Sequence, residues 1–126
     1  MKRPASAPRS REVFHVERHG NTLIVSPQRD CLDVQESDLR VEIEYLHKLM
    51  DEPGVVNLIV DTGTAPHFGS IIIGAIMALC KKAHDRGGRA AFCNASPGML
   101  DAMQIMKIDS VMPYYPTRAQ ALASLQ

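Results

Sequence analysis

A histidine and a serine lie close enough in the sequence to raise the question of nucleophilic catalysis. His67 precedes Ser70 by three residues, and a histidine beside a serine can act as the base that activates the hydroxyl. No acidic residue that would orient the imidazole is evident beside the pair. A hydrolase that uses these two residues is therefore the least favoured interpretation, and we expect a protein that is not an enzyme.

Neither metal binding nor disulfide chemistry is expected. His15 and His19 are four residues apart on a predicted strand, which leaves a wide gap, and no carboxylate pair accompanies them in a ligand geometry. Cys31, Cys80 and Cys93 are odd in number, widely spaced and without a CxxC pair, which favours a reduced, cytosolic protein. Cys80 and Cys93 fall on apolar faces, where inert core cysteines are the default.

Cofactor-binding motifs are missing as well. The sequence contains no GxGxxG, no Walker loop and no GxSxG, the patterns that bind phosphates or position a nucleophilic serine. Gly69 and Gly74 do not have the spacing of a phosphate-binding loop. We therefore expect no cofactor, no metal and no catalytic residues.

The start of the second expected helix is the place where a modification would have most effect. Ser70 is a candidate N-cap there, because its hydroxyl can accept a hydrogen bond from a free amide of the first turn. A phosphate on this serine would meet those amides and the positive end of the helix dipole, and would add about −1.5 to −2 charges. It could then repel an acidic partner or block close packing. The local sequence alone favours the alternative that Ser70 is only an N-cap.

Short strands and amphipathic helices must position these residues. Alternation over residues 14–19, a turn signal at Gly20–Asn21 and a β-rich run over residues 22–25 predict a hairpin. The apolar run VVNLIV (55–60) is typical of a strand buried on both faces. Further strands are expected over residues 89–94 and 111–115, and helices over residues 38–50, 71–85, 97–106 and 118–125. The order β-β-α-β-α-β-α-β-α predicts an α/β sandwich with a mixed sheet and about four helices.

Helical periodicity predicts which side chains face the core. In the first helix the apolar positions are Leu39, Ile43, Leu46 and Met50, and the other face carries Glu42, Glu44 and Lys48. In the third helix the side chains expected to point inward are Met99, Leu100, Met103 and Met106. Ser96–Pro97 predicts the start of this helix, and Gly87–Gly88 predicts the end of the second one.

The composition indicates one globular domain with an uneven charge distribution. The 126 residues (13.9 kDa) are 45% apolar and 22% charged, ordinary values for such a domain. The formal net charge is zero, but residues 1–11 carry +4 and the remainder carries −4. We expect a disordered basic tail over residues 1–11 and a folded domain over residues 12–126. An acidic fold is a poor candidate for direct nucleic-acid binding.

No membrane attachment is expected. The longest apolar runs, such as residues 71–73, are far too short to span a bilayer. The first residues lack the apolar segment of a secretory signal. Together with the cysteine pattern, these features predict a cytoplasmic protein.

Residues 55–124 resemble a known family. The matching stretches are VVNLIVD (55–61), FGSIIIGAIMALCKKA (68–83), GGRAAFCNASP (87–97) and DSVMPYYPTRAQALASL (109–125). In this order they are similar to the STAS domain of the anti-sigma factor antagonist type. Its members show an apolar strand ending in Asp, an Asp-Ser-Ser-Gly-Leu-Gly junction, a helix, a Gly-Gly turn and a strand ending in Asn-x-x-Pro. The earlier residues, including the segment around Asp30, fit more loosely.

The resemblance implies a small mixed sheet covered by helices and a role in partner switching. Such a protein binds an anti-sigma factor or a switch protein kinase, and this releases a sigma factor or another target. Phosphorylation of a serine at the start of the second helix ends that binding. The partner-binding residues are then expected at the strand end, in the loop and in the first helical turns: Asp61, Thr62, His67, Phe68, Gly69, Ser70, Ile71 and Gly74.

The junction departs from the family pattern at the usual phosphate acceptor. Ser70 matches the first serine of the motif, but Ile71 stands where the second one is expected, and Gly69 replaces the aspartate. Gly74 matches a later glycine that allows close helix packing. Ser70 is therefore the phosphorylation candidate, rotated by about 100° around the helix from the usual position. Either the acceptor has shifted by one residue, or this site is not controlled by phosphorylation.

Other partners and ligands stay open at this point. A small-ligand or nucleotide-binding sensor of the same fold is the alternative function, with an anion held at the helix N-terminus. A homodimer is a further option. Eight acidic residues lie between Asp30 and Glu52, against Arg40 and Lys48 as the bases. The first helix is therefore predicted to offer an acidic face to a basic partner.

Overall fold

Alternating apolar and polar residues at the start of the chain form a hairpin. The computed structural model describes residues 14–28, 36–63 and 70–125, without the side chains of residues 36–38 and 70. β1 (Phe14–His19) and β2 (Thr22–Pro27) pair antiparallel across a two-residue turn. Gly20 in this turn has a φ of 61°, a left-handed conformation that glycine adopts without steric cost. The predicted hairpin is confirmed, and its second strand is two residues longer than expected.

Three parallel strands extend the hairpin into a five-stranded sheet in the order β1-β2-β3-β4-β5. β3 (Asn57–Asp61), β4 (Ala90–Cys93) and the short β5 (Tyr114–Tyr115) each run parallel to their neighbour. Helices make the crossovers, as parallel strands require. The mixed sheet and the predicted order of strands and helices are therefore confirmed.

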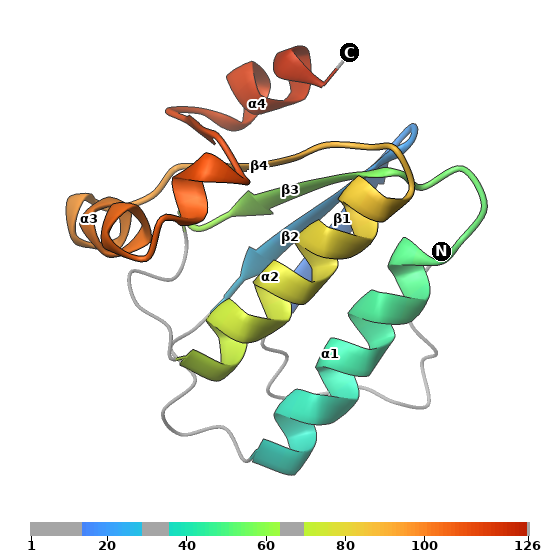
Figure 1. Cartoon of the computed structure of the whole chain (residues 1–126). Coiled ribbons are helices and arrows are strands. Elements are labelled where there is room, and N and C mark those ends of the chain that lie inside the picture. Colours follow the sequence, from blue (N-terminus) through green and yellow to red (C-terminus); the bar gives the residue numbers. More distant parts are fainter. Residues whose placement is uncertain (1–13, 29–35, 64–69, 126) are drawn as a thin grey trace.

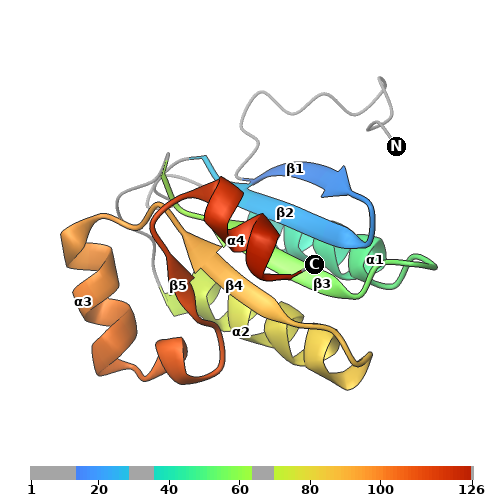
Figure 2. The ribbon, with the colours of Figure 1, turned by 90° about the horizontal axis from the view of Figure 1, so that it is seen from above.

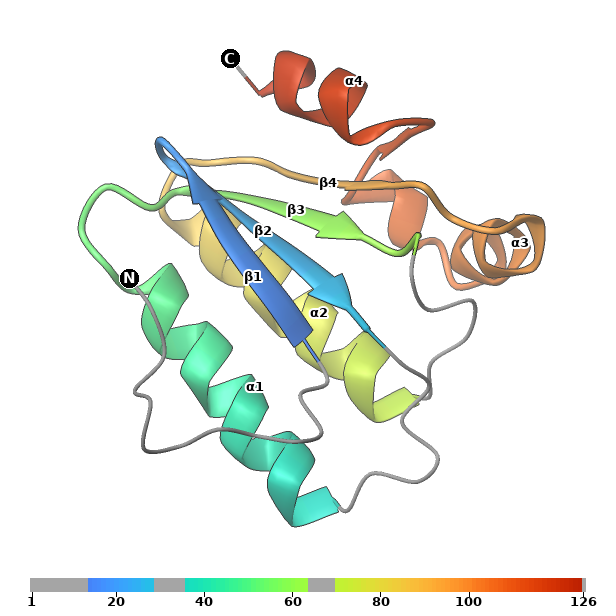
Figure 3. The same ribbon diagram turned by 180° about the vertical axis from the view of Figure 1, so that it is seen from behind.

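The helices cover the two faces of the sheet unequally (Figures 1 and 2). α1 (Glu36–Met50) and α2 (Ser70–Asp85) lie side by side on one face, and α3 (Pro97–Ile105) lies beyond the end of the sheet. A 3₁₀ turn, η2 (Ile108–Ser110), precedes β5 and was not expected from the sequence. α4 (Arg118–Ser124) is the helix on the opposite face. Figure 3 shows β1 at the edge of the sheet.

Successive side chains of a strand point to opposite faces of the sheet. The core therefore consists of two clusters, one on each face. Leu23, Leu58 and Phe92 belong to the large cluster under α1 and α2. Ile24 and Ile59 point the other way and pack with α4 in a smaller cluster. The run 55–60 is therefore a strand buried on both faces, as expected, although the strand itself begins at Asn57.

The two described cysteines are core residues. Cys80 and Cys93 are buried and free, which confirms that they lie in the core. Burial raises the pKa of Cys93 to about 12 and also raises the pKa of Cys80. Cys31 lies outside the described residues.

Two side-chain placements differ from the sequence prediction. Glu42 was assigned to the outer face of the first helix, but it is 1% exposed and accepts a hydrogen bond from the amide of Phe14 at 3.3 Å. Met106 was expected to point inward, but it is 45% exposed because α3 ends before it. The helix starts at Pro97 and Ser96 caps it, as predicted.

None of the helices within the described ranges combines the length and apolar character that crossing a membrane requires.

Candidate functional site

The carboxyl ends of β3 and β4 meet in a compact polar cluster. Asp61 ends β3, and one of its carboxylate oxygens, Oδ1, accepts hydrogen bonds from the amide of Gly63 at 3.0 Å and from Nδ2 of Asn94 at 3.1 Å. The other oxygen, Oδ2, accepts from Nε of Arg118 at 3.0 Å. Asp61 is 8% exposed. Its carboxylate thus joins β3, the segment after β4 and the start of α4.

The surroundings of Asp61 favour the ionised carboxylate. Burial by itself would raise the pKa of Asp61, since it disfavours charge. The hydrogen bonds from Gly63, Asn94 and Arg118 outweigh burial and hold the pKa of Asp61 below its ordinary value. This carboxylate is therefore a charged anchor inside the fold, with its hydrogen bonds directed at neighbouring residues.

Arg118 bridges three strands from the first position of α4. Its Nη1 donates to Oε2 of Glu17 on β1 at 2.9 Å, its Nε to Asp61 on β3, and its Nη2 to Oγ of Ser26 on β2 at 3.5 Å. A guanidinium is suited to this because its donors are fixed in one plane. Sequence reasoning missed Arg118 and Glu17 as part of the site. We define these four residues, Glu17, Ser26, Asp61 and Arg118, as the Arg118 cluster.

Glu17 is the most strongly shifted acid of this cluster. The hydrogen bond from Arg118, followed by that from His19, lowers the pKa of Glu17 from 4.5 to about 2. Its two oxygens also lie 3.3 Å from Nε2 of His15 and 3.3 Å from Nε2 of His19. The carboxylate of Glu17 therefore lies between His15 and His19, the two histidines whose spacing was considered for metal binding. Within the described residues no group of three or more histidine, cysteine or acidic side chains could hold a metal ion.

Thr62 fixes the first residue of the following loop. It is 2% exposed, and both its amide and its hydroxyl donate to the carbonyl of Cys93, at 3.0 and 3.3 Å. Asp61 and Thr62 were predicted to contact a partner. That role stays a prediction, and the geometry supports an indirect contribution, in which both residues hold the start of the loop.

The centre of the predicted binding loop lies outside the described residues. This applies to His67, Phe68 and Gly69 and to the side chain of Ser70. α2 begins at Ser70, one residue earlier than expected. The predicted roles of these four residues stay predictions.

The exposed side of α2 next to this loop is nearly free of polar groups. Ile71 is 47% exposed, and Gly74 and Ala78 are exposed at the third and seventh following positions, which places them on the same helical face. A Cβ on Gly74 would have no atom of the described chain within 4 Å. Within the described residues, therefore, no other segment packs closely against Gly74. We call Ile71, Gly74 and Ala78 the α2 stripe.

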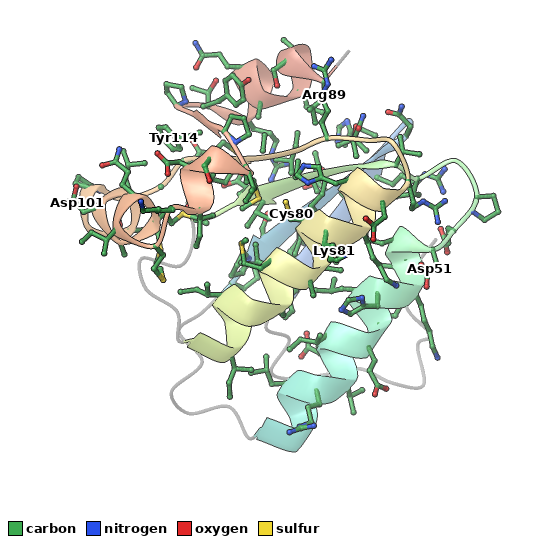
Figure 4. All side chains as sticks on the ribbon, viewed as in Figure 1. Asp51, Cys80, Lys81, Arg89, Asp101 and Tyr114 are labelled. Carbon is green, nitrogen blue, oxygen red and sulfur yellow. The ribbon has the colours of Figure 1, made fainter. Side chains whose placement is uncertain are left out.

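The predicted acidic face of the first helix is largely occupied by intramolecular contacts. Glu42 is buried, Asp51 forms an ion pair with Lys82 of α2 at 2.9 Å, and Glu52 pairs with Arg18 of β1 at 3.4 Å. Figure 4 shows Asp51 at the end of α1 beside α2. The described side chains do not include those of Asp30, Asp33, Glu36 and Asp38. Glu44 is exposed, so the described part of α1 keeps one acidic side chain in solvent in place of the broad acidic surface that was expected.

Comparison with known families identifies the class of protein that this fold represents. The family model of the STAS domain matches residues 14–121. The chain therefore belongs to the STAS domain family, as its sequence pattern suggested. No curated protein matches it at a significant level.

Solved structures give the same fold at low sequence identity. An anti-sigma-factor antagonist (STAS) domain protein from Planctomyces limnophilus has a TM-score of 0.73 at 23% identity, with 90% of this chain and 97% of that chain covered. An anti-sigma factor antagonist from Mycobacterium paratuberculosis has a TM-score of 0.70 at 20% identity, covering 89% and 92%. The phosphorylated form of the Bacillus cell fate determinant SpoIIAA has a TM-score of 0.61 at 19% identity, covering 90% and 99%. At these identities the likeness establishes the fold.

Proposed function

We propose that this protein is a non-enzymatic, cytoplasmic regulator that binds a protein partner through the start of α2. The observation that carries the proposal is the α2 stripe. Ile71 places a large apolar side chain in solvent, and Gly74 beside it leaves the helix surface open. A large apolar side chain on an open helix surface can anchor a protein partner, and its burial in a complex would be favourable.

The fold favours one location for such a partner. The loop before α2 begins at Thr62 and Gly63, and the hydrogen bonds of Asp61, Asn94 and the carbonyl of Cys93 hold this starting point. α2 follows at Ser70. The described residues on either side of this segment, Gly63 and the first turn of α2, are thus held by the fold, which supports a partner site that includes the α2 stripe.

The proposed partner is an anti-sigma factor or a switch protein kinase. Membership of the STAS family and the likeness to anti-sigma factor antagonists support this choice. In this role the unmodified protein would bind the partner, and the partner would then release its own target.

Substitution of Ile71 tests the binding surface. We expect Ile71→Arg to weaken binding of the purified partner by at least about tenfold, because a charge would replace an apolar contact at the centre of the interface. Candidate partners are the kinase-like anti-sigma factors of the native cell, and isothermal titration calorimetry measures their affinity. The matched control is Ile105→Arg, since Ile105 is 80% exposed at the end of α3, away from the stripe.

Equal loss of affinity in both variants would indicate a general effect of charge and would contradict this surface. Unchanged affinity in Ile71→Arg, with the wild type binding, would do the same. If no kinase-like anti-sigma factor binds the folded wild type, the proposed partner class is wrong.

We further propose that phosphorylation of Ser70 ends this binding. The hydroxyl belongs to the first residue of α2, where a phosphate adds about −1.5 to −2 charges beside the partner surface. Ser70→Glu should lose partner binding, and Ser70→Ala should keep it. Equal affinities of the two variants would remove Ser70 from the mechanism. Because a substitution in the first turn of a helix can itself change stability, the unfolding free energy of both variants is measured in parallel.

A further inference from the structure

A pocket of about 370 Å³ lies between β4, β5 and the end of α4. Its polar lining includes Arg89, Ser110 and Tyr115, and its apolar lining includes Val111, Pro113 and Leu125. His84, near the end of α2, also borders it. The pocket therefore lies at the opposite end of α2 from the α2 stripe, and a ligand bound there would be independent of the proposed partner binding.

The pocket lies beside the part of β4 that β5 does not reach, because β5 is shorter than β4, the strand with which it pairs. β5 pairs with β4 only at Phe92 and Cys93, and the amide of Phe92 donates to the carbonyl of Pro113 at 2.9 Å. At Ala90 the edge of β4 has no strand partner on this side within the described residues. Backbone groups at an unpaired edge offer hydrogen bonds to whatever fills the space beside them. Ala90 and its neighbour Ala91 also border the pocket.

Arg89 brings a positive charge to this pocket without an acidic partner. Its Nη1 donates to the carbonyl of Ser124 at 3.1 Å, and Figure 4 places it beside α4. No acidic side chain lines the pocket in the described part of the chain, and none there forms an ion pair with Arg89. Arg18 and Arg118, by contrast, are both paired with carboxylates. The remaining donors of the Arg89 guanidinium are thus available to a ligand.

We propose that this pocket binds a small organic anion. The anionic head group would accept hydrogen bonds from Arg89, because a guanidinium presents paired donors to a carboxylate or a phosphate. A short apolar or aromatic part would lie against Val111, Pro113 and Leu125. The volume of about 370 Å³ is at the lower end of the range for small-molecule sites, and it is sufficient for a substituted benzene ring. The small-ligand site expected from the sequence lies at the start of the second helix, whereas this pocket borders the end of that helix.

Titration of the full-length protein with simple aromatic probes tests the proposal. Benzoate and phenyl phosphate supply the two head groups, and benzamide is a neutral analogue of benzoate with the same shape. We expect at least one anion to cause saturable NMR shifts at the amides of residues 89–91, and benzamide to bind at least about tenfold more weakly. The anion that binds more tightly identifies the head-group class.

Two variants and a matched control locate the binding. Arg89→Gln removes the charge and should lower the anion affinity at least about tenfold. Val111→Trp adds bulk at an exposed lining position, 38% exposed, and should weaken both anions without changing the charge. The control is Arg86→Gln, because Arg86 is exposed, lies three residues away and does not line the pocket.

Three results would overturn the proposal. The first is the absence of saturable shifts with either anion at about 10 mM, a concentration about tenfold above a dissociation constant of about 1 mM. The second is binding of benzamide that is as tight as the binding of the tighter of the two anions. The third is an equal loss of affinity in Arg89→Gln and Arg86→Gln, since that would show a diffuse charge effect.

Discussion

At the scale of single residues, Arg118 determines how α4 is attached to the sheet. It contacts Glu17, Ser26 and Asp61 on three neighbouring strands. Of its two carboxylate partners, Asp61 has the less exposed side chain, at 11%, so removal of Arg118 would leave a nearly buried carboxylate without its cationic partner. Loss of one partner from such a pair costs more than the pair contributes on balance.

Replacement of Arg118 by glutamine should change how stability depends on pH. The folded-state pKa of Glu17 is lowered from 4.5 to about 2, and that of Asp61 is also lowered. The stability from these shifts is present above the unfolded pKa and is lost as the pH falls from about 4.5 towards 2. Arg118→Gln should therefore destabilise the protein at pH 7 by about 1–3 kcal/mol, and by clearly less near pH 2.5. Urea denaturation at both pH values measures the difference.

A surface arginine provides the control for this prediction. Arg18 pairs with Glu52 at 3.4 Å, and both side chains are substantially exposed. Arg18→Gln should change the unfolding free energy by less than about 1 kcal/mol, because exposed ion pairs contribute little. A difference between Arg118→Gln and the wild type that stays constant from pH 7 to pH 2.5 would contradict the assignment of the lowered pKa values to Arg118.

The Arg118 cluster shows why a sequence reveals only part of a site. Asp61 was singled out through the resemblance to the STAS family, whose members have an apolar strand that ends in Asp. Glu17 and Arg118 are 101 positions apart, and no local pattern connects them. Their contact depends on the sheet order and on the placement of α4 over the face opposite α1 and α2, which only the folded chain supplies.

At the scale of elements, two glycines near the ends of α2 have opposite structural roles. Gly74 lies inside α2, is exposed, and has open space where a Cβ would be. Gly88 follows the helix, and a Cβ there would lie 1.8 Å from the carbonyl oxygen of Val56. The segment after α2 can therefore approach β3 closely only because residue 88 lacks a side chain.

Alanine at these two positions should shift stability in opposite directions. Gly74→Ala should raise the free energy of unfolding by about 0.5–1 kcal/mol, the usual gain at an exposed helix interior. Gly88→Ala should lower it, because the backbone of Val56 would have to move. Urea denaturation of both variants measures the two shifts. A destabilised Gly74→Ala protein would mean that Gly74 is in contact with another part of the chain, and a neutral Gly88→Ala protein would contradict the close approach to Val56.

Periodicity identified the elements better than it identified the surroundings of their side chains. The apolar stripe of α1 is confirmed for Leu39, Leu46 and Met50, which are all buried. Glu42 is also buried, because its carboxylate meets the amide of Phe14 on a distant strand. A charged residue assigned by spacing alone is placed on the outer face, since periodicity contains no information about such a partner.

At the scale of the whole molecule, partner binding and the proposed anion pocket are separated along α2. The α2 stripe lies at the beginning of this helix and His84 of the pocket near its end. A 16-residue helix is about 24 Å long. The two proposals can therefore be tested independently, and failure of one does not affect the other.

The order of elements and the mixed sheet could be predicted from local patterns. Each apolar run and each apolar helix face must be buried against another element, and this requirement is visible in the sequence itself. Asp61, Thr62, Ile71 and Gly74 were selected through the family resemblance, and their role in partner binding stays a prediction. The open space beside Gly74 could not be predicted, since the resemblance to other family members suggested that another segment packs closely at that position.

NMR mapping of the complex tests the central claim most directly. The ¹⁵N-labelled protein is titrated with a purified kinase-like anti-sigma factor from the native cell, and the perturbed amides are located on the fold. The proposed function predicts the largest perturbations at residues 71–78 and in the loop before them, with the amides of residues 97–105 and 89–91 unchanged. Perturbations confined to α3, β5 or the pocket, with the first turns of α2 unchanged, would contradict it.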